Sequence, residues 1–399
     1  MDKFCRGIWI SCLLFLVTGC WDQNEIEERG FVVGAAIDMV EEQMDDSIGG
    51  TSEKDRGDKY KLTYQFVIPG NFLGGGSSGG ASEGKAFLNL TSKGTSIHQI
   101  TRKISTETSR KPYLEHITLI VLSEELSKKG YLKDAMDFFV RDHEMRRVAK
   151  VMIAEGEART VLEINPQHEK MPALFIASLN ENIVKHSTSL PPVNISDIHS
   201  YLLKGNSFAI PRIVVKNNKG SIVGAAIFNS QNQKMVGTLN ESETLGLNFI
   251  TEKVESAIVE FLMNGQLIAF EIKDAKSKIE ADVSDKDQIK FTVKINVEGN
   301  VGELYGDLGL QNQSILSEIE EKASKEIERI TNRVIDKVQK KYKADVFGLG
   351  DHLKQEHYKT WKQVNKEWDK GENYFSKSVI DVQVKVEVRQ IGSSIKTIK

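Results

Sequence analysis

The sequence predicts an α+β fold with more than one domain, mixed or antiparallel sheets, and a long amphipathic helix in the C-terminal half. Three observations support this expectation. The 399 residues, 40% of them hydrophobic, suffice for two or three domains of about 100–200 residues each. Strand and helix patterns are interspersed without the steady alternation of a doubly wound fold. In the second half, short strands precede one long helical stripe.

Charge and hydropathy exclude two broad classes of protein. The 53 Lys and Arg stand against 56 Asp and Glu, a net charge of −3, so no basic excess neutralises phosphates. Nucleic-acid binding is therefore not expected as the main function. The mean hydropathy is −0.32, and no apolar run reaches the roughly 20 residues of a spanning helix. A polytopic membrane protein is excluded on this ground.

Residues 1–19 have the pattern of a secretory signal. Lys3 and Arg6 precede an apolar stretch from Ile8 to Val17, and small residues follow it. The alternative is a buried N-terminal helix. The polar run from Trp21 to Arg29 disfavours that alternative.

The end of this signal, Leu16-Val17-Thr18-Gly19-Cys20, resembles the lipobox of bacterial lipoproteins. In such proteins the cysteine is alkylated with diacylglycerol and the signal is cut in front of it. A thiolate is the nucleophile suited to accept the lipid, and two or three acyl chains hold a protein firmly to a membrane. Cys5 and Cys12 fall within the signal, so a disulfide framework is excluded. We predict lipidation at Cys20.

The first half begins with two expected strands, at 31–40 and 60–68, which pair as a hairpin around the polar loop 41–58. A Gly-rich loop follows at 74–84. The later elements are expected in this order: a strand at 87–91, a helix from the capping residue Ser96 to Lys111-Pro112, a strand at 116–122, helices at 124–129 and 132–141, a strand at 148–154, and helices at 158–164, 171–185 and 195–203.

The Gly-rich loop contains a near match to a phosphate-binding loop. Gly79, Gly84 and Lys85 have the G-x-x-x-x-G-K spacing. Ala86 stands where a magnesium-binding hydroxyl is needed, and a strand pattern follows where phosphate binding requires a helix N-terminus. We therefore predict no phosphate site here.

The second half is expected to form an antiparallel sheet covered by a helix. Apolar residues alternate with polar ones at 291–297 and 382–388, which is typical of half-buried strands. One apolar stripe runs from Ile315 to Tyr342 with spacing mostly of four, which favours a helix packed on a sheet over a coiled coil. The remaining expected elements are strands at 210–215, 222–228, 235–239, 254–262 and 267–273 and a helix from Leu353 to Trp368.

These patterns give the following domain organisation. A removed signal at 1–19 and a lipid-anchored segment at 20–30 precede an N-terminal domain at 31–205, in which 171–205 forms a transition region. A C-terminal domain at 206–399, divisible near residue 300, completes the chain.

The sequence contains no motif typical of catalysis. His143-Glu144 and His168-Glu169 lack a second His four residues on, and no G-x-S-x-G motif occurs. We expect no catalytic residue, metal ligand or cofactor; a surface hydrolase is the enzymatic alternative. The densest polar cluster, 141–147, is interpreted either as a recognition patch or as a charged helix end paired internally and with Arg110 or Glu115. The second interpretation is favoured.

Several segments together resemble the Ger(x)C family of spore germination lipoproteins, in order along nearly the whole mature chain. They are Gly19 to Gly30, Tyr64 to Pro69, Ser109 to His116, Phe139 to Glu144, Gly224 to Phe228, Met235 to Gly237, Asp345 to Gly350, and Trp361.

This resemblance implies a membrane-anchored C subunit of a nutrient germinant receptor, required for germination. Its implied partners are a multi-spanning A subunit and a transporter-like B subunit, at the outer face of the spore inner membrane. The implied role is a non-enzymatic scaffold, with direct nutrient binding left open. The alternative is a solute-binding lipoprotein of an ABC transporter, which the alternating strands disfavour because such proteins usually carry parallel sheets.

Overall fold

The computed structural model of the chain describes residues 28–40, 59–72, 85–183, 188–305, 310 and 312–390. The expected signal, Cys20, the loop at 41–58 and the whole Gly-rich loop at 74–84 lie outside these residues. Within the described part, no helix is both long enough and apolar enough to cross a membrane.

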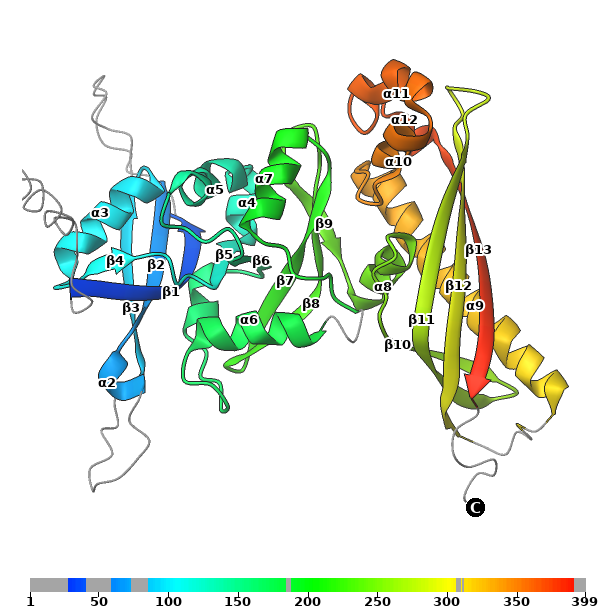
Figure 1. Cartoon of the computed structure of the whole chain (residues 1–399), viewed down its shortest axis with the longest axis horizontal. Helices are drawn as coiled ribbons and strands as arrows, with labels where there is room; N and C mark the ends of the chain where they lie inside the picture. Colours follow the sequence, from blue (N-terminus) through cyan, green and yellow to red (C-terminus); the bar gives the residue numbers. More distant parts are fainter. Residues whose placement is uncertain are drawn as a thin grey trace, which may run out of the picture.

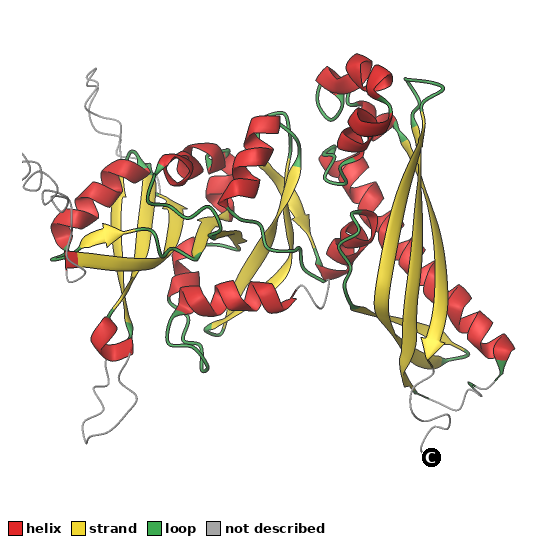
Figure 2. Ribbon diagram, viewed as in Figure 1, coloured by secondary structure: helices red, strands yellow, loops and turns green. Residues whose placement is uncertain are grey.

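The described residues form two units, each built on its own sheet (Figures 1 and 2). Both sheets are mixed, so the predicted α+β class is confirmed. The first sheet has the order β3-β2-β1-β5-β6-β7-β8-β9, with β4 paired to β1. Its strands are β1 Arg29–Met39, β2 Tyr60–Val67, β3 Phe87–Gly94, β4 Lys111–Tyr113, β5 Leu119–Ser123, β6 Lys150–Ala154, β7 Phe208–Lys216, β8 Lys219–Phe228 and β9 Met235–Leu239.

The centre of the first sheet is parallel, through β1, β5, β6 and β7, and both flanks are antiparallel. The expected hairpin of β1 and β2 is confirmed. All five residues of β5 are buried because each face of the sheet is covered. Ile120 and Leu122 face one core, and Leu119 and Val121 face the other.

Helices cover the two faces unequally. The helices α3, α4, α5 and α7 supply residues to the first core, whereas α6 and the 3₁₀ segment supply the second. Ser96 caps α3 by accepting a hydrogen bond from the Gln99 N–H, as predicted. The bounds are α2 Pro69–Phe72, α3 Ile97–Glu107, α4 Glu124–Lys129, α5 Leu132–Arg141, a 3₁₀ helix Ala158–Leu162, α6 Pro172–Ile183 and α7 Ile195–Lys204.

The second sheet has the order β10-β11-β12-β13. The pairs β10·β11 and β11·β12 are antiparallel, but β12 and β13 are parallel. The expectation of a purely antiparallel sheet is therefore wrong. The alternation of apolar and polar residues along a strand indicates that one face of the sheet is covered and the other is exposed. It does not indicate whether neighbouring strands run parallel or antiparallel. The strands are β10 Ala257–Met263, β11 Gln266–Asp282, β12 Lys290–Leu304 and β13 Val379–Gln390.

The predicted long helix is present and covers one face of this sheet (Figure 1). It consists of α9, Gln313–Asp336, and a π-helical turn, Lys337–Tyr342. Its predicted stripe is buried, with Ile319, Ala323 and Ile327 fully inaccessible.

The helix expected from Leu353 to Trp368 is interrupted. His357 has a non-helical backbone conformation, so the segment divides into shorter pieces. These pieces and the last helix are α10 Leu349–Glu356, α11 Tyr358–Val364, a 3₁₀ turn Asn365–Glu367 and α12 Tyr374–Lys377.

A helix that the sequence patterns did not predict, α8 (Glu241–Ile250), joins the two units. It packs on β8 of the first sheet and on α9 of the second unit. The first sheet continues through β9 to Leu239, so the expected division at 205/206 falls inside this sheet. One apolar core runs across the junction, from Ala225 in β8 to Phe291 in β12.

Candidate functional site

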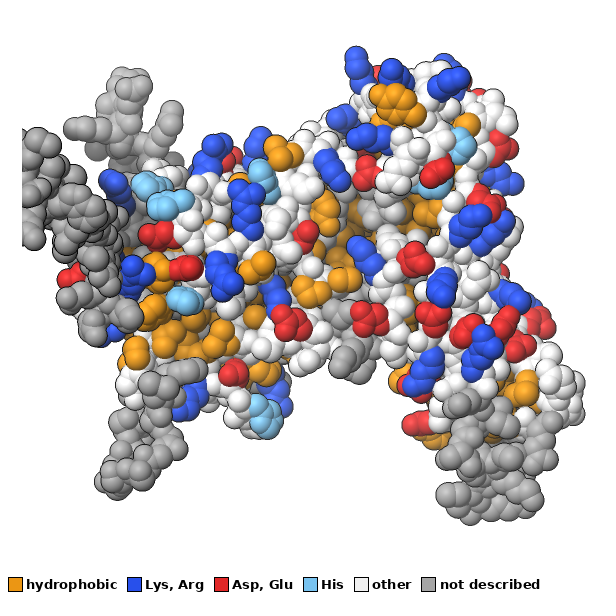
Figure 3. All heavy atoms as spheres, in the orientation of Figure 1, with side chains coloured by type: hydrophobic (Ala, Val, Ile, Leu, Met, Phe, Trp, Pro, Cys, Tyr) orange, Lys and Arg blue, Asp and Glu red, His pale blue; other side chains and the backbone are white. Residues whose placement is uncertain are grey.

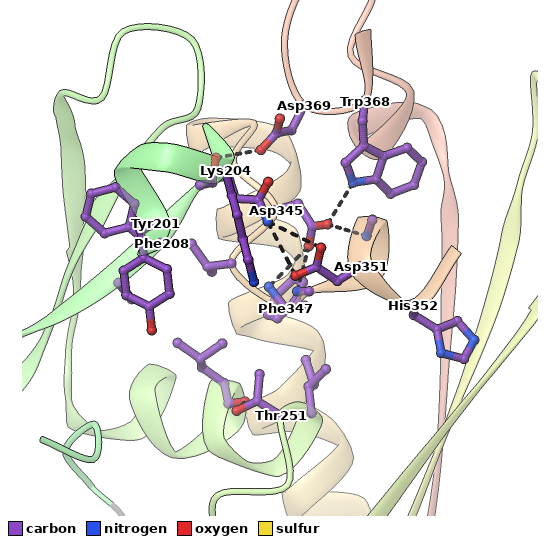
Figure 4. Close-up of a pocket in the computed structure, with 18 of the residues that line it drawn as sticks. Tyr201, Lys204, Phe208, Thr251, Asp345, Phe347, Asp351, His352, Trp368 and Asp369 are labelled. Atoms are coloured by element: carbon purple, nitrogen blue, oxygen red, sulfur yellow. Dashed lines mark hydrogen bonds between the residues drawn. The ribbon is translucent and has the colours of Figure 1, made fainter. Parts of the chain in front are cut away.

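A cavity of about 520 Å³ lies between the two units. Residues from α7, β7, α8 and β11 line it, together with the segment 345–370. Figure 3 shows the surface hollowed between the units, with hydrophobic side chains in the hollow, and Figure 4 shows the residues that line the cavity.

Asp345 forms one wall of this cavity. Its carboxylate accepts hydrogen bonds from the backbone N–H groups of residues 347–350, at 2.7–3.2 Å. The Trp368 indole N–H donates a further bond of 2.7 Å. Burial raises the pKa of Asp345 to about 6, against the lowering effect of these donors. Both carboxylate oxygens are therefore engaged in holding the start of α10 and the Trp368 ring in place.

This arrangement explains the segment Asp345 to Gly350, which carried part of the family resemblance. A Cβ atom at Gly350 would lie 2.7 Å from Nε1 of Trp368. Any side chain there would push the indole away from Asp345. Trp361 packs edge-on against Trp368, with ring centroids 6.2 Å apart. The segment shapes the cavity wall.

A buried polar network closes the cavity between the units. Asp369 accepts hydrogen bonds from the hydroxyls of Ser207 and Ser230, each at 2.6 Å. Ser207 in turn accepts a bond from the backbone N–H of Ser230 at 2.9 Å. Ser207 precedes β7 and Ser230 follows β8, so Asp369 ties the second unit to the first sheet. Figure 4 shows Asp369 pointing toward this contact.

Charged side chains outside these networks also line the cavity, Glu252 among them. Lys204, Lys253 and Lys370 line it, and none of the ion pairs between described residues includes them. Figure 4 shows the Lys204 side chain extended into the cavity. Asp351 also lines the cavity, and its carboxylate accepts a hydrogen bond of 3.4 Å from the side-chain amide of Asn206. Burial holds the pKa of His352 below its ordinary value, so this imidazole is neutral near pH 7.

Hydroxyl groups also line the cavity. The Ser207 hydroxyl donates to Asp369 and the Thr251 hydroxyl donates to the Leu247 carbonyl. The buried Ser277 hydroxyl has no hydrogen-bond partner among the described residues. In the described part of the chain, no three His, Cys, Asp or Glu side chains gather as a metal site would require.

The polar cluster 141–147 lies apart from this cavity. Cys20 falls outside the described residues. In the cluster 141–147, Arg141 pairs with Asp137 at 2.8 Å and is exposed. Glu115 bonds the Tyr113 hydroxyl, and pairing of the cluster with Arg110 or Glu115 is not found within the described ranges. Arg141 is thus an exposed helix end whose partner is Asp137. The recognition-patch interpretation stays a prediction, since Arg141, Asp142 and His143 line a second cavity of about 560 Å³.

Sequence reasoning missed the cavity as a site. The segments that form it were noted only as parts of a family resemblance. The usable signal was a short one, an Asp followed by Gly-Leu-Gly and later by two tryptophans. Ser207 and Ser230 carry no local signal because their partner lies more than 130 residues away.

The fold and cavity define a class of protein: a two-unit α+β protein with a cavity at the junction of the units. Two family models match it. The N-terminal domain of spore germination proteins matches residues 22–215, and the spore germination B3/GerAC-like C-terminal domain matches residues 223–392. The chain belongs to this family of spore germination proteins, and the Ger(x)C resemblance is confirmed.

Relatives match along their whole lengths. Spore germination protein YndF of Bacillus subtilis is 33% identical over 396 residues, with 96% of each chain covered. Spore germination protein B3 of the same organism is 27% identical over 384 residues, again with 96% of each covered. The fold is similar to the crystal structure of the GerBC protein, with a TM-score of 0.60 and 24% identity over 85% of this chain and 96% of that one. Membership in this family rules out the alternative of a solute-binding lipoprotein of an ABC transporter.

Proposed function

We propose that this chain is the lipid-anchored C subunit of a nutrient germinant receptor, held through Cys20 at the outer face of the spore inner membrane. The observation that carries the proposal is the match of both spore germination domains across residues 22–392. The lipobox pattern that ends at Cys20 lies directly in front of the first matched domain.

The subunit acts as a non-enzymatic scaffold for multi-spanning A-type and transporter-like B-type subunits. Lipid anchoring confines the protein to a membrane surface and raises its effective concentration near other membrane proteins. A modest interface then suffices for assembly. The junction cavity, whose lining includes three lysines outside the ion pairs of the described residues, supports a role in contact.

Germination of mutant spores tests this function. Spores that lack the protein should lose the response to the receptor's nutrient, and Cys20→Ala spores should respond more weakly, with subunit levels checked by blotting. His143→Ala and Glu144→Ala serve as controls because both side chains are exposed and outside the junction cavity. An abundant, partner-bound His143→Ala protein without any response would contradict the scaffold role.

A further inference from the structure

We infer that the end of the molecule where β1 begins is a docking surface for anionic phospholipid headgroups, and that it orients the protein on the bilayer. We call this surface the β1 tip; it consists of Arg29, Phe31, Arg102, Lys103, Arg110, Lys111, Tyr113 and His116. The inference rests on the proposed lipid anchor at Cys20.

Backbone pairing brings the β1 tip together. The short strand β4 pairs in parallel with the start of β1, so Arg29 lies beside Lys111 and Phe31 beside Tyr113. The last turn of α3 leads directly into β4. Figure 1 shows the start of β1, β4 and the end of α3 at one end of the long axis, opposite the second unit.

Three partly or fully exposed rings form an aromatic cluster at the β1 tip. Phe31, Tyr113 and His116 contact one another edge-on, with centroids 5.3–5.9 Å apart. The Arg29 guanidinium lies 4.3 Å from the centroid of the Tyr113 ring. Amphipathic rings with a cation beside them suit the headgroup level of a bilayer, where one side is apolar and the other is wet.

Basic side chains surround this cluster. Arg102, Lys103, Arg110 and Lys111 are exposed, and the ion pairs found among the described residues include neither these four nor Arg29. The acids nearby are Glu28, Glu107 and Glu115, and Glu115 accepts a bond from the Tyr113 hydroxyl. Among the described residues of this surface, five cations stand against three carboxylates, while the preceding segment from Cys20 carries Asp22, Glu25 and Glu27 as well. Such patches attract anionic lipid surfaces.

The short segment between Cys20 and Arg29, which we call the tether, favours lipid as the partner of this surface. Arg29 follows Cys20 by nine positions, and a fully extended chain of that length reaches roughly 30 Å. An acyl anchor at Cys20 therefore keeps the β1 tip within that distance of the membrane in every molecule. The bilayer is the surface that this end meets first, before any protein partner has assembled.

This orientation has a consequence for the junction cavity. The β1 tip and the second unit lie at opposite ends of the long axis (Figure 1). With the tip on the headgroups, the second unit and the cavity beside it project away from the bilayer. They would then face extramembrane parts of partner subunits.

Energy transfer from the protein to labelled lipid tests the orientation. The mature chain carries only Cys20 as a thiol, so the lipidated full-length product leaves an introduced cysteine free for a fluorophore. Glu107→Cys places the probe at the tip, and Gln355→Cys places it in α10 of the second unit. Both positions are exposed. Vesicles contain headgroup-labelled acceptor in either pure phosphatidylcholine or a mixture of phosphatidylcholine with phosphatidylglycerol, whose anionic headgroup gives the surface a negative potential.

We expect transfer several-fold higher from residue 107 than from residue 355 on the anionic vesicles, and a much smaller difference on phosphatidylcholine. The triple change Lys103→Glu, Arg110→Glu and Lys111→Glu should remove the difference. The matched control is Lys322→Glu, Lys354→Glu and Lys359→Glu, three exposed lysines of the second unit, which should preserve it.

Each outcome is decisive. Equal transfer from both probes on anionic vesicles, or a difference that survives the tip charge reversal, overturns the docking surface. A difference that is the same on phosphatidylcholine shows that the tether alone orients the protein and also overturns it. Flotation with vesicles is measured first. A protein that fails to float contradicts the proposed lipid anchor, and that failure is thereby distinguished from a failure of the docking surface. If the triple variant misfolds, the comparison of anionic with phosphatidylcholine vesicles, made on the protein without the triple change, still tests the docking surface.

Discussion

At the residue scale, single polar groups hold the units together. Tyr342, at the end of the π-helical turn, donates its hydroxyl proton to the Thr238 carbonyl at 2.9 Å and lies 3.2 Å from the Thr238 N–H, which donates to it. Thr238 belongs to β9, the edge strand of the first sheet, so the ring covers an edge that would otherwise be unpaired. A Cβ atom at Gly237 would lie 2.3 Å from this ring, which explains the glycine in Met235 to Gly237.

We predict that Tyr342→Phe destabilises the protein by about 1–3 kcal/mol, because it leaves both backbone groups of Thr238 without that partner. Urea unfolding measures the decrease in the free energy of unfolding. Tyr358→Phe is the matched control, since Tyr358 is 54% exposed and its loss should stay within about 0.5 kcal/mol. Equal effects of the two changes would contradict the edge-capping role.

A second prediction concerns the buried carboxyl of Asp38. Burial raises its pKa to about 6, against the backbone N–H groups of Ala158 and Arg159, which lower it. The unfolded group has the ordinary value of 3.8, so the folded state binds more protons between these values. The stabilisation is therefore complete below about pH 4 and is lost as the pH rises through about 6.

Asp38→Asn cannot titrate. The unfolding free energy of the wild type minus that of Asp38→Asn should therefore fall by about 2 kcal/mol between pH 4.5 and 7.5. Urea unfolding at both pH values measures this difference, and Asp381→Asn, at an exposed position, serves as the control. A difference that rises with pH would show that the carboxylate is the stabilised form.

At the scale of elements, periodicity predicted most of the strands and helices and missed those set by distant contacts. Ser96 and the isoleucines of α3 carry a local signal, and the helix is present as expected. The helix α8 was missed because residues 243–250 are all buried, so no polar face gives it a helical period. The parallel pairing of β12 with β13 was missed because both strands have one open face and alternate like antiparallel ones.

The same limit applies to the site. The turn from Asp345 to Gly350 could be found from its residue types, but the use of its carboxylate depends on Trp368, 23 residues further on. The contact of Asp369 with Ser207 and Ser230 depends on the packing of the two units. Such long-range contacts leave no periodic trace in the sequence.

The long helix gives the prediction at this scale. Ile327 is fully buried between α9 and the second sheet, so Ile327→Asp places an unpaired charge in the core. We expect a loss of several kcal/mol and a lower melting temperature. Lys322→Asp, on the exposed face of the same helix, should change stability little. An unchanged melting temperature for Ile327→Asp would show that the helix does not pack on the sheet.

At the scale of the whole molecule, the two units are joined by a continuous apolar core and by the Asp369 network. The buried carboxylate Glu243 of α8 adds an ion pair to Lys337 at 2.6 Å. These contacts favour a rigid scaffold over two independently moving domains. A rigid body with the proposed anchor at one end and a cavity in its middle suits the proposed role of positioning partners above a membrane.

The most direct test of this proposal is acyl labelling of Cys20→Ala in sporulating cells, with membrane fractionation. We predict that Cys20→Ala abolishes incorporation of labelled fatty acid and moves the protein to soluble or uncut forms, because Cys20 provides the acceptor thiol. Cys12→Ala is the matched control, since Cys12 lies within the expected signal, and it should label and fractionate like the wild type. A Cys20→Ala protein that still carries the label and remains in the membrane fraction would contradict the lipid anchor.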